Sequence, residues 1–435
     1  MKTKLCLLTL ALLLLGIAGC AAPTAPPLDL SGDAEPFVFT GRSYDLAYYF
    51  EHRIETRAEE FDLLIIGHDG FTARISGDSL DGCALVYDNG WHLQSAYHPP
   101  SANVRDITQI VVISTSDDPY AIRLVDAEEQ VQTLTAGQMH LLDTHRVLNE
   151  EGTNRLNNRS VTVYTTRQLV SLPLAGDSFV AMSRSGETMF FRGAAYLTGG
   201  THISLQLSDG RLLHDLVGVM AEPPGFLITE AFHDAVRFLE QGERVLLIKL
   251  DGLGWNMLDA APFIASLEPH RALAVYPPVT PTGLAAMLTG ATPDQSGIGG
   301  RGERELIVPD IFEVVEQLNK TSIHIGARNS FINTSLSPQL TLSDADAFEL
   351  AMQHLDTDLL FIHFKGIDVA AHYYGPHADA TRQVIAEIDD FVRVLMESFE
   401  GRVIITADHG LHETEAGGNH GLFLPEDMIV PYIIR

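Results

Sequence analysis

The chain has 435 residues, which is too long for one ordinary domain and sufficient for two or three. Its composition, 46% hydrophobic and 20% charged, is that of a soluble globular protein. The formal net charge of −29 argues against a nucleic-acid partner, because binding to a phosphate backbone needs basic patches. It also gives no long-range attraction for anionic substrates, so a phosphate site would need its own local positive charge, such as bound metal ions.

The first twenty residues have the features of an export signal. Lys2 and Lys4 precede an apolar run at residues 5–17, which is too short to span a bilayer comfortably. The ending Gly-Ile-Ala-Gly-Cys resembles a bacterial lipobox, in which Cys20 would be lipidated and become the mature N-terminus. The resemblance implies an exported protein anchored to the outer face of the cell membrane, or to the outer membrane of a two-membrane cell. Plain secretion after cleavage near Gly19 is the alternative.

A stretch rich in proline and alanine follows at residues 21–27, and we expect a tether with little structure over residues 21–40. The chain has three cysteines, of which Cys6 lies in the segment expected to be removed and Cys20 is the expected anchor. Because Cys83 is then left alone, no intramolecular disulfide is expected in the mature chain.

Residues 41–225 are expected to form a β-rich region, which begins with one amphipathic helix at residues 44–58. Short β-type runs are separated by Asp-Gly, Asn-Gly and Pro-Pro turn signals. These runs cover residues 62–67, 84–87, 107–114 and 161–164. The same pattern of short β-type runs separated by turn signals repeats over residues 178–217, where a run beginning at Phe179 aligns with one beginning at Phe61. The alignment suggests a duplicated β module.

The sequence pattern changes after a Pro-Pro-Gly sequence at residues 223–225. From there, continuous apolar runs alternate with helical segments. The expected strands cover residues 245–250, 272–276, 322–325, 359–364 and 402–406. The expected helices cover residues 227–240, 283–288, 310–318, 345–354 and 378–399. This alternation predicts that residues 226–435 form an α/β domain with a doubly wound, mostly parallel sheet covered on both faces.

Polar side chains follow several of these strands, where the ligand sites of such sheets lie. They are acidic, imidazole and hydroxyl groups without any thiol: Asp251, Thr280, Asp368, His372, Asp408, His409 and His420. Oxygen and nitrogen ligands of this kind suit zinc, manganese or iron in a hydrolytic site. Each group alone has an ordinary explanation, such as a turn, a helix cap or a surface pair. Their joint occurrence, in order and at strand ends, favours one metal site.

Residues 244–435 resemble the alkaline phosphatase superfamily, in particular its branch of type I phosphodiesterases and nucleotide pyrophosphatases. The nucleophile motif of the family matches Thr280 to Gly290, its Asp-x-x-x-His-x-x-Gly-Pro motif matches Asp368 to Pro376, and its Asp-His-Gly motif begins at Asp408. The resemblance implies two bound zinc ions, with manganese or iron as alternatives. One ion would be held by Asp251, Thr280, Asp408 and His409, and the other by Asp368, His372 and His420.

Thr280 is the expected nucleophile, and the resemblance implies a phospho-threonine intermediate. A free threonine hydroxyl is a weak nucleophile at neutral pH, but coordination to a metal lowers its pKa. The N-terminus of the helix that follows favours an alkoxide and a phosphate group. Thr282 is the alternative nucleophile, although the spacing of the motif favours Thr280. The expected reaction is metal-dependent hydrolysis of a small phosphorylated substrate.

Arg301 marks a departure from the family pattern. Diesterase members usually carry Asn at this position, whereas Arg offers a charge and a two-pronged donor to phosphate oxygens. We expect Arg301 to contact the phosphoryl group and to favour monoesters; the alternative is a solvated loop residue. Three further residues near the expected site are expected to be structural or solvent-facing: Asn329, Lys365 and His412.

Two other functions compete with this interpretation. A sulfatase or a phosphomutase would use the same fold, but residue 280 is Thr where sulfatases need Cys or Ser, and residues 301–358 leave room only for a small cap. A surface-binding lipoprotein with a vestigial metal site is an alternative of another class. The presence of all seven expected ligands argues against it.

Overall fold

The computed structural model describes residues 25–142, 145–147, 153–156, 159–162, 168–199, 202–326 and 331–435. The expected export signal and Cys20 lie outside these residues. In the described part of the chain, no helix is long and apolar enough to cross a membrane. The chain divides into two compact units. One comprises residues 1–121, 135–143 and 199–201, and the other comprises residues 122–134, 144–198 and 202–435.

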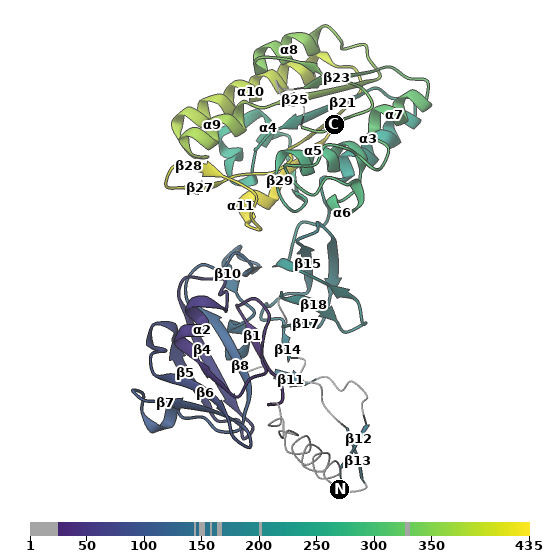
Figure 1. The fold of residues 1–435 in the computed structure, drawn as a ribbon. Coiled ribbons are helices and arrows are strands. Elements are labelled where there is room, and N and C mark those ends of the chain that lie inside the picture. The colour runs from purple at the N-terminus through teal and green to yellow at the C-terminus, as the bar shows by residue number, and fades with distance from the viewer. Residues whose placement is uncertain are drawn as a thin grey trace, which may run out of the picture. The chain divides into compact units, whose positions relative to one another are not determined.

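The first unit is built on a five-stranded sheet (Figure 1). In spatial order its strands are β2 (Phe37–Phe39), β1 (Leu28–Gly32), β8 (Ile107–Ser114), β4 (Phe61–Gly67) and β5 (Thr72–Ser76). A smaller sheet and a helix complete it: β3 (Ser43–Asp45), β6 (Cys83–Tyr87), β7 (Trp91–Ser95) and α2 (Leu46–His52).

Two sequence expectations for this unit are corrected by the structure. The tether does not extend to residue 40, because Leu28 and Leu30 are buried in β1 and pack in the core of the unit. The helix expected over residues 44–58 is shorter. The Asp45 carboxylate accepts a hydrogen bond from the backbone N–H of Tyr48 and caps the start of α2, which ends at His52. Beyond it, Thr56 pairs with Ala34, between β1 and β2, through an isolated β-bridge.

The second unit contains another five-stranded sheet. Its order is β10 (Val131–Leu134), β9 (Ile122–Val125), β20 (Leu216–Ala221), β15 (Ser178–Ser183) and β16 (Thr188–Arg192). A further sheet consists of β11 (His145–Val147), β14 (Gln168–Ser171), β17 (Ala195–Thr198), β18 (Ser204–Leu207) and β19 (Leu212–Leu213), and β12 (Thr153–Leu156) pairs with β13 (Arg159–Thr162). The strand expected at residues 161–164 begins inside β13, and residues 163–164 lie outside the described residues.

The two five-stranded sheets have the same topology. In each, an antiparallel pair (β1 with β2, β9 with β10) joins a parallel neighbour (β8, β20), which is followed by an antiparallel hairpin (β4 with β5, β15 with β16). The hairpins are those whose sequences align. The two sheets thus match in strand order and direction, while the duplicated module itself stays a prediction from the sequence.

The C-terminal part of the second unit contains a seven-stranded sheet. Its order is β22 (His270–Leu273), β29 (Ile429–Ile434), β26 (Arg402–Thr406), β21 (Val245–Leu250), β25 (Leu359–Phe364), β23 (Ser322–Gly326) and β24 (Gln339–Leu340). Pairing is parallel from β26 to β24, while β29 runs antiparallel to both β22 and β26. The predicted mostly parallel sheet is confirmed. The C-terminal strand β29 was not predicted.

Helices cover both faces of this sheet, with α8, α9 and α10 on one side and α3, α5 and α7 on the other (Figure 1). Their bounds are α3 (Glu230–Glu240), α4 (Pro262–Ser266), α5 (Thr280–Thr289), α6 (Pro293–Ser296), α7 (Ile311–Gln317), α8 (Asp344–Met352), α9 (Gly366–Tyr374), α10 (Asp379–Ser398) and α11 (Pro425–Met428). A short hairpin of β27 (His412–Thr414) and β28 (Gly417–Asn419) follows β26. Between the helical layers, the sheet forms one continuous apolar core.

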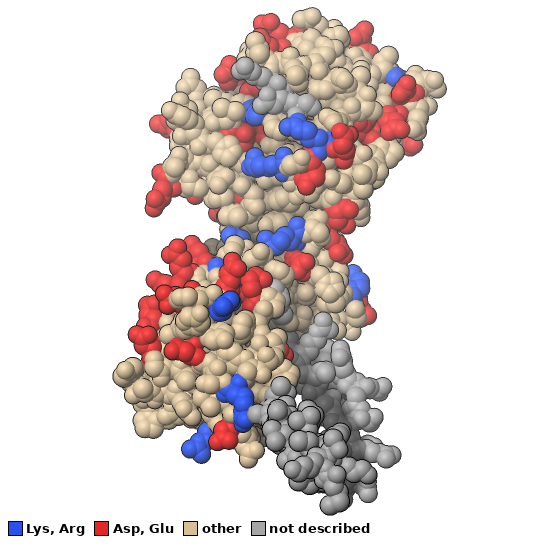
Figure 2. All heavy atoms as spheres, viewed as in Figure 1, with Lys and Arg blue, Asp and Glu red and all other residues tan. Residues whose placement is uncertain are grey.

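Acidic side chains are spread over the face of the molecule drawn in Figure 2 and outnumber the basic ones there. Among the described residues on this face, the basic side chains form only small groups. This distribution agrees with the net charge of −29.

Candidate metal centre

Acidic residues follow three parallel strands at one edge of the C-terminal sheet. Asp251 follows β21 directly, Asp408 lies two residues beyond β26, and Asp368 lies in the first turn of α9, which follows β25. Because β21 pairs in parallel with both β25 and β26, the carboxyl ends of the three strands lie side by side. The expectation that the polar groups share one edge of the sheet is therefore met for these carboxylates.

Thr280 is the first residue of α5 and is 3% exposed. Its Oγ1 lies 3.4 Å from Asp251 Oδ1 and 3.3 Å from His409 Nε2. The helix can approach the edge of the sheet this closely because residue 283 is a glycine. A Cβ on Gly283 would lie 2.5 Å from the Cβ of Asp408 and 2.6 Å from its backbone oxygen. A larger residue there would displace the helix that carries Thr280.

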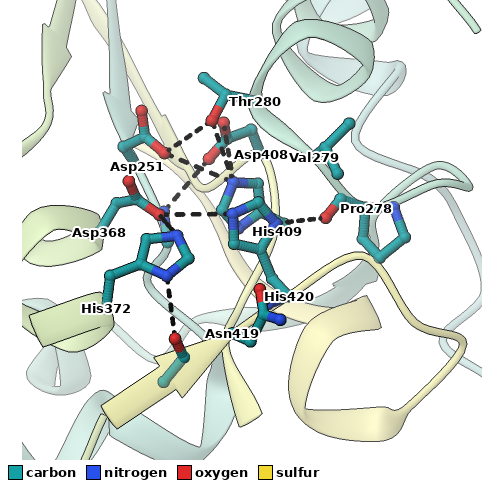
Figure 3. Close-up of polar contacts among 12 residues, drawn as sticks. Asp251, Pro278, Val279, Thr280, Asp368, His372, Asp408, His409, Asn419 and His420 are labelled. Atoms are coloured by element: carbon teal, nitrogen blue, oxygen red, sulfur yellow. Dashed lines mark hydrogen bonds and ion pairs between the residues drawn. The ribbon is translucent and has the colours of Figure 1, made fainter. Parts of the chain in front are cut away.

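The first candidate ligand set is fully buried and consists of Asp251, Asp408 and His409. Ligand atoms of the three residues lie within 4.8 Å of one another. His409 Nε2 is 3.5 Å from Asp251 Oδ1 and 3.6 Å from Asp408 Oδ2. With Thr280 Oγ1 beside Asp251 and His409, all four residues expected to hold the first ion converge (Figure 3).

The second candidate set lies beside the first. Asp368 Oδ1 is 3.3 Å from His372 Nε2 and 3.6 Å from His420 Nε2. The rings of His409 and His420 are stacked with centroids 3.8 Å apart, so His409 lies between the two sets (Figure 3). Asp368, His409 and His420 also have ligand atoms within 4.8 Å of one another. All seven sequence-predicted ligands are therefore brought together, and His409 lies close enough to serve either set.

The three imidazoles are oriented as metal ligands are. The Nδ1 atoms of His372, His409 and His420 lie 2.9, 3.0 and 2.8 Å from the carbonyl oxygens of Gly418, Gly410 and Pro278. A carbonyl only accepts hydrogen bonds, so each Nδ1 carries a proton, and in the neutral ring the lone pair is then on Nε2. All three Nε2 atoms face the carboxylates (Figure 3). Backbone carbonyls commonly fix metal-binding histidines in this way.

One buried carboxylate oxygen of the centre, Asp368 Oδ1, has no hydrogen-bond partner in the described part of the chain. Its neighbours are the Nε2 atoms of His372 and His420, at 3.3 and 3.6 Å. An unpaired buried oxygen is costly, and a cation at this position would satisfy it. Together with the orientation of the imidazoles, this atom shows that the residues present fit a metal ion.

Burial and neighbouring charges shift the pKa values in the centre. Burial lowers the pKa of His420 to about 3, with a further contribution from His409, so the ring is neutral near pH 7. Burial acts to raise the pKa of Asp251, but the charge of Lys249 and contacts with His363 and His409 outweigh it and the pKa is lowered. Burial raises the pKa of Asp408, and the charge of Asp251 adds to the effect. A neutral imidazole beside an ionised carboxylate is a ligand pair suited to a divalent ion.

Two residues of the centre, Lys249 and His363, were missed at the sequence level. Lys249 is fully buried, and its Nζ lies 3.0 Å from Asp251 Oδ2 and 2.8 Å from Asp408 Oδ2. His363 Nε2 lies 2.6 Å from Asp251 Oδ2. Each is a single polar residue within an apolar strand, in Val-Leu-Leu-Ile-Lys-Leu and Leu-Leu-Phe-Ile-His-Phe. A lysine inside a strand expected to be buried could have drawn attention to this site, because a buried lysine needs an acidic partner.

Arg301 reaches the second set from the loop after α6. Its Nη2 lies 3.2 Å from His420 Nε2, and the residue is exposed. Thr282, the alternative nucleophile, is turned away: its Oγ1 lies 2.6 Å from the oxygen of Pro277 and 2.8 Å from that of Val279. These backbone contacts at the start of α5 explain why Thr282 is buried. The hydroxyl that faces the carboxylates is that of Thr280.

Two further residues named from the sequence, Lys365 and His412, lie outside the two sets. The Lys365 Nζ lies over the Phe331 ring, 4.6 Å from its centroid. His412 Nδ1 lies 2.8 Å from Asp427 Oδ1. Asn329 lies outside the described residues. A cavity of about 950 Å³ opens beside Asp368 and His372. Its apolar walls include Leu342, Val369, Tyr373, Val384 and Ile388.

The C-terminal part of the chain thus combines an α/β sheet with carboxylate, imidazole and hydroxyl groups gathered at one edge. Residues 245–304 and 313–429 match the family described as type I phosphodiesterase / nucleotide pyrophosphatase. The resemblance inferred from the sequence motifs is thereby confirmed. The C-terminal part of the chain is related to this family, within the alkaline phosphatase superfamily.

Two human proteins are similar to parts of the chain. The catalytic subunit of GPI ethanolamine phosphate transferase 3 is 23% identical over 280 residues, which cover 54% of this chain and 25% of that protein. The catalytic subunit of GPI ethanolamine phosphate transferase 2 is 27% identical over 88 residues, which cover 18% of this chain and 9% of that protein. The chain thus spans about a quarter or less of the length of these relatives.

Solved structures are similar to part of the chain. Murine ectonucleotide pyrophosphatase / phosphodiesterase 5 matches with a TM-score of 0.34 and 16% identity, covering 40% of this chain and 58% of that one. Phosphonoacetate hydrolase from Sinorhizobium meliloti 1021 matches with a TM-score of 0.33 and 16% identity, covering 39% of this chain and 57% of that one.

Proposed function

We propose that the protein is a metal-dependent phosphoric ester hydrolase with Thr280 as its nucleophile. The observation that carries this proposal is the convergence of the Thr280 hydroxyl with two carboxylates and a histidine at one helix N-terminus. Activity should appear on loading with zinc when p-nitrophenyl phosphate, bis(p-nitrophenyl) phosphate and a nucleotide are compared as substrates. Absence of turnover on all three by the zinc-loaded protein would contradict the proposal.

The metal ions are proposed to be two zinc ions, with manganese or iron as alternatives. Asp251, Thr280, Asp408 and His409 would hold one, and Asp368, His372 and His420 the other. When bound, the ions would supply positive charge for the phosphoryl oxygens and lower the pKa of coordinated hydroxyl groups and water. The imidazoles offer their Nε2 lone pairs because their protons are held on Nδ1 by backbone carbonyls.

The proposed reaction proceeds in two displacements. Thr280 Oγ1, as an alkoxide, attacks phosphorus, and the bond from phosphorus to the ester oxygen breaks and releases an alcohol after protonation. A water molecule then attacks the phospho-threonine, which releases phosphate or its monoester and restores the hydroxyl. Thr280 is the first residue of α5, and the positive end of the helix dipole there would favour the negative charge in both displacements.

The substrate is proposed to be a small phosphorylated molecule whose organic part occupies the cavity beside Asp368 and His372. The volume of about 950 Å³ and the apolar walls suit a group much larger than a methyl ester. Transfer of the phosphoryl group to an alcohol instead of water is the alternative, because two relatives are ethanolamine phosphate transferases by name. The ratio of transfer to hydrolysis in the presence of ethanolamine distinguishes the two reactions.

We predict that Arg301→Ala lowers kcat/KM for a monoester by about tenfold to a hundredfold and affects a diester much less. The lost charge-assisted hydrogen bond is worth about 1.5–3 kcal/mol, and a monoester carries about two charges on three non-bridging oxygens. Comparing p-nitrophenyl phosphate with bis(p-nitrophenyl) phosphate measures the preference ratio. Arg393→Ala, which changes a partly exposed arginine of α10 paired with Asp390, is the matched control. Equal losses on both substrates would contradict the phosphate contact.

Export and lipid attachment at Cys20 are a further proposal from the first twenty residues. We predict that Cys20→Ser moves the protein from the membrane fraction to the soluble fraction, because a lipid on this residue would be its hydrophobic anchor. Fractionation followed by immunoblotting measures the change. If Cys20→Ser stays in the membrane fraction, the lipobox interpretation is wrong.

A further inference from the structure

The buried Lys249 lies against both carboxylates of the first ligand set. It occupies the fifth position of β21, where the side chain is 0% exposed. Its Nζ is 3.0 Å from Asp251 Oδ2, 2.8 Å from Asp408 Oδ2 and 2.9 Å from His363 Nε2. A lysine almost never lies wholly inside a protein unless its charge is paired. Here the partners are two residues that would also bind a metal ion.

The two oxygens of Asp251 have different neighbours. Oδ2 is contacted by Lys249 and by His363 at 2.6 Å, whereas Oδ1 faces Thr280 Oγ1 and His409 Nε2. Lys249 therefore holds one side of the carboxylate and leaves the other toward the nucleophile. Asp408 is fixed similarly, since its Oδ1 accepts a hydrogen bond from the backbone N–H of Gly252 at 3.3 Å while its Oδ2 lies against Lys249.

The charges of the first set change in a simple way when an ion binds. Asp251, Asp408 and Lys249 together carry one negative charge if all are ionised, and a divalent ion would bring the total to one positive charge. Without the lysine, the same ion would leave the set neutral. Like charges at short range inside a protein repel strongly, because the effective dielectric constant is far below that of water. Lys249 and the ion therefore compete for the same carboxylates.

We propose that Lys249 is a positioning residue that holds Asp251 and Asp408 in place before metal binds and that lowers the affinity of this set for a divalent ion. The inference rests on the metal centre of the proposed function. Two consequences follow from the charges. The metal-free protein keeps a pre-formed site, since its buried carboxylates already have a cationic partner. The metal-loaded site keeps one extra positive charge, which favours an anionic phosphate ester and an alkoxide on Thr280.

A purely structural lysine would behave in the opposite way. If Lys249 only kept the strand and its neighbours in place, its removal would misplace Asp251 and Asp408 and weaken metal binding. If it acts through its charge, removal should strengthen metal binding even though the metal-free protein becomes less stable. The sign of the change in metal affinity separates the two roles without reference to catalytic activity.

The test compares zinc affinity in wild type, Lys249→Met and Lys249→Gln, by competition with a chromophoric chelator. We expect both variants to bind zinc at least about tenfold more tightly at the first set, since each removes a charge close to the ion. Zinc should also raise the melting temperature of each variant more than that of wild type. The glutamine variant retains hydrogen-bonding groups, so the comparison does not depend on the methionine variant alone.

Further variants show which ligand set is responsible for the gain in zinc affinity. The gain in affinity should persist when Asp368→Asn disables the second set, and should disappear when Asp251→Asn disables the first. Lys320→Met, which removes a lysine paired with Asp358 away from the centre, should leave zinc affinity unchanged. Equal or weaker zinc binding by both Lys249 variants overturns the inference and leaves the metal centre standing. Failure of wild type to bind zinc overturns the metal centre together with the inference.

Discussion

Thr280→Ala is expected to lower the turnover of phosphate esters by a factor of about 10³ or more, because removal of a catalytic nucleophile commonly has an effect of this size. The substitution removes the hydroxyl that lies between Asp251 Oδ1 and His409 Nε2 and leaves the rest of the centre in place. Steady-state kinetics on a zinc-loaded protein measure the loss. Thr280→Ser, which retains a hydroxyl at the same position, should keep most of the activity.

Thr282→Ala is the matched control for the nucleophile. Its hydroxyl contacts backbone oxygens at the start of α5, so we expect a loss of stability of about 1 kcal/mol and a small change in turnover. A phosphorylated peptide trapped at low pH and containing Thr280 would identify the nucleophile directly. If Thr282→Ala proves more damaging to turnover than Thr280→Ala, the assignment is wrong.

The C-terminal fold was predictable because its strands are buried on both faces and read as continuous apolar runs. The strands at residues 245–250, 359–364 and 402–406 were predicted at their observed bounds. The long amphipathic helix α10 was predicted to within one residue at each end. In a parallel sheet the carboxyl ends of the strands lie at one edge. Polar residues that directly follow the strands in sequence can therefore be predicted to lie close together in the structure.

The parts that were missed depend on contacts between distant segments. Leu28 and Leu30 follow a proline-rich stretch, and only the pairing of β1 with β2 and β8 shows that they lie in a strand. The helix α2 ends at His52, and the chain beyond it pairs with Ala34 through Thr56, which the local periodicity does not reveal. Strand β29 lies at the end of the chain, and its antiparallel pairing with β22 and β26 could not be read from local pattern.

The candidate ligands were named from motifs, whereas their orientation required the structure. No sequence pattern shows that Gly418, Gly410 and Pro278 offer carbonyl oxygens to three imidazoles. Lys249 was hidden for a similar reason, because a single lysine does not change the apolar character of β21. Such residues become informative when their burial and partners are known, since a buried charge must be explained by what surrounds it.

His372→Ala is expected to remove one of two bound metal ions and to lower turnover by a factor of about 10² or more, as loss of a direct ligand commonly does. His372 is the most suitable ligand to change because its side chain is 37% exposed and lies apart from the buried contacts of Lys249. Removing Asp408 instead would deprive that lysine of one carboxylate partner and would destabilise the core. The fold of the His372 variant should therefore survive.

Metal content and activity of the His372 variant should be measured on the same preparation. Elemental analysis after zinc loading and removal of free metal should give two ions per chain for wild type and one for His372→Ala. The exposed His68, which lies outside the metal centre, provides the control substitution His68→Ala, for which content and turnover should equal those of wild type. Thermal unfolding of the metal-free proteins should be nearly the same, because the Asp368 carboxylate left by His372 remains beside His420. A His372 variant that keeps both ions and full turnover would show that the second set, as assigned, does not bind metal.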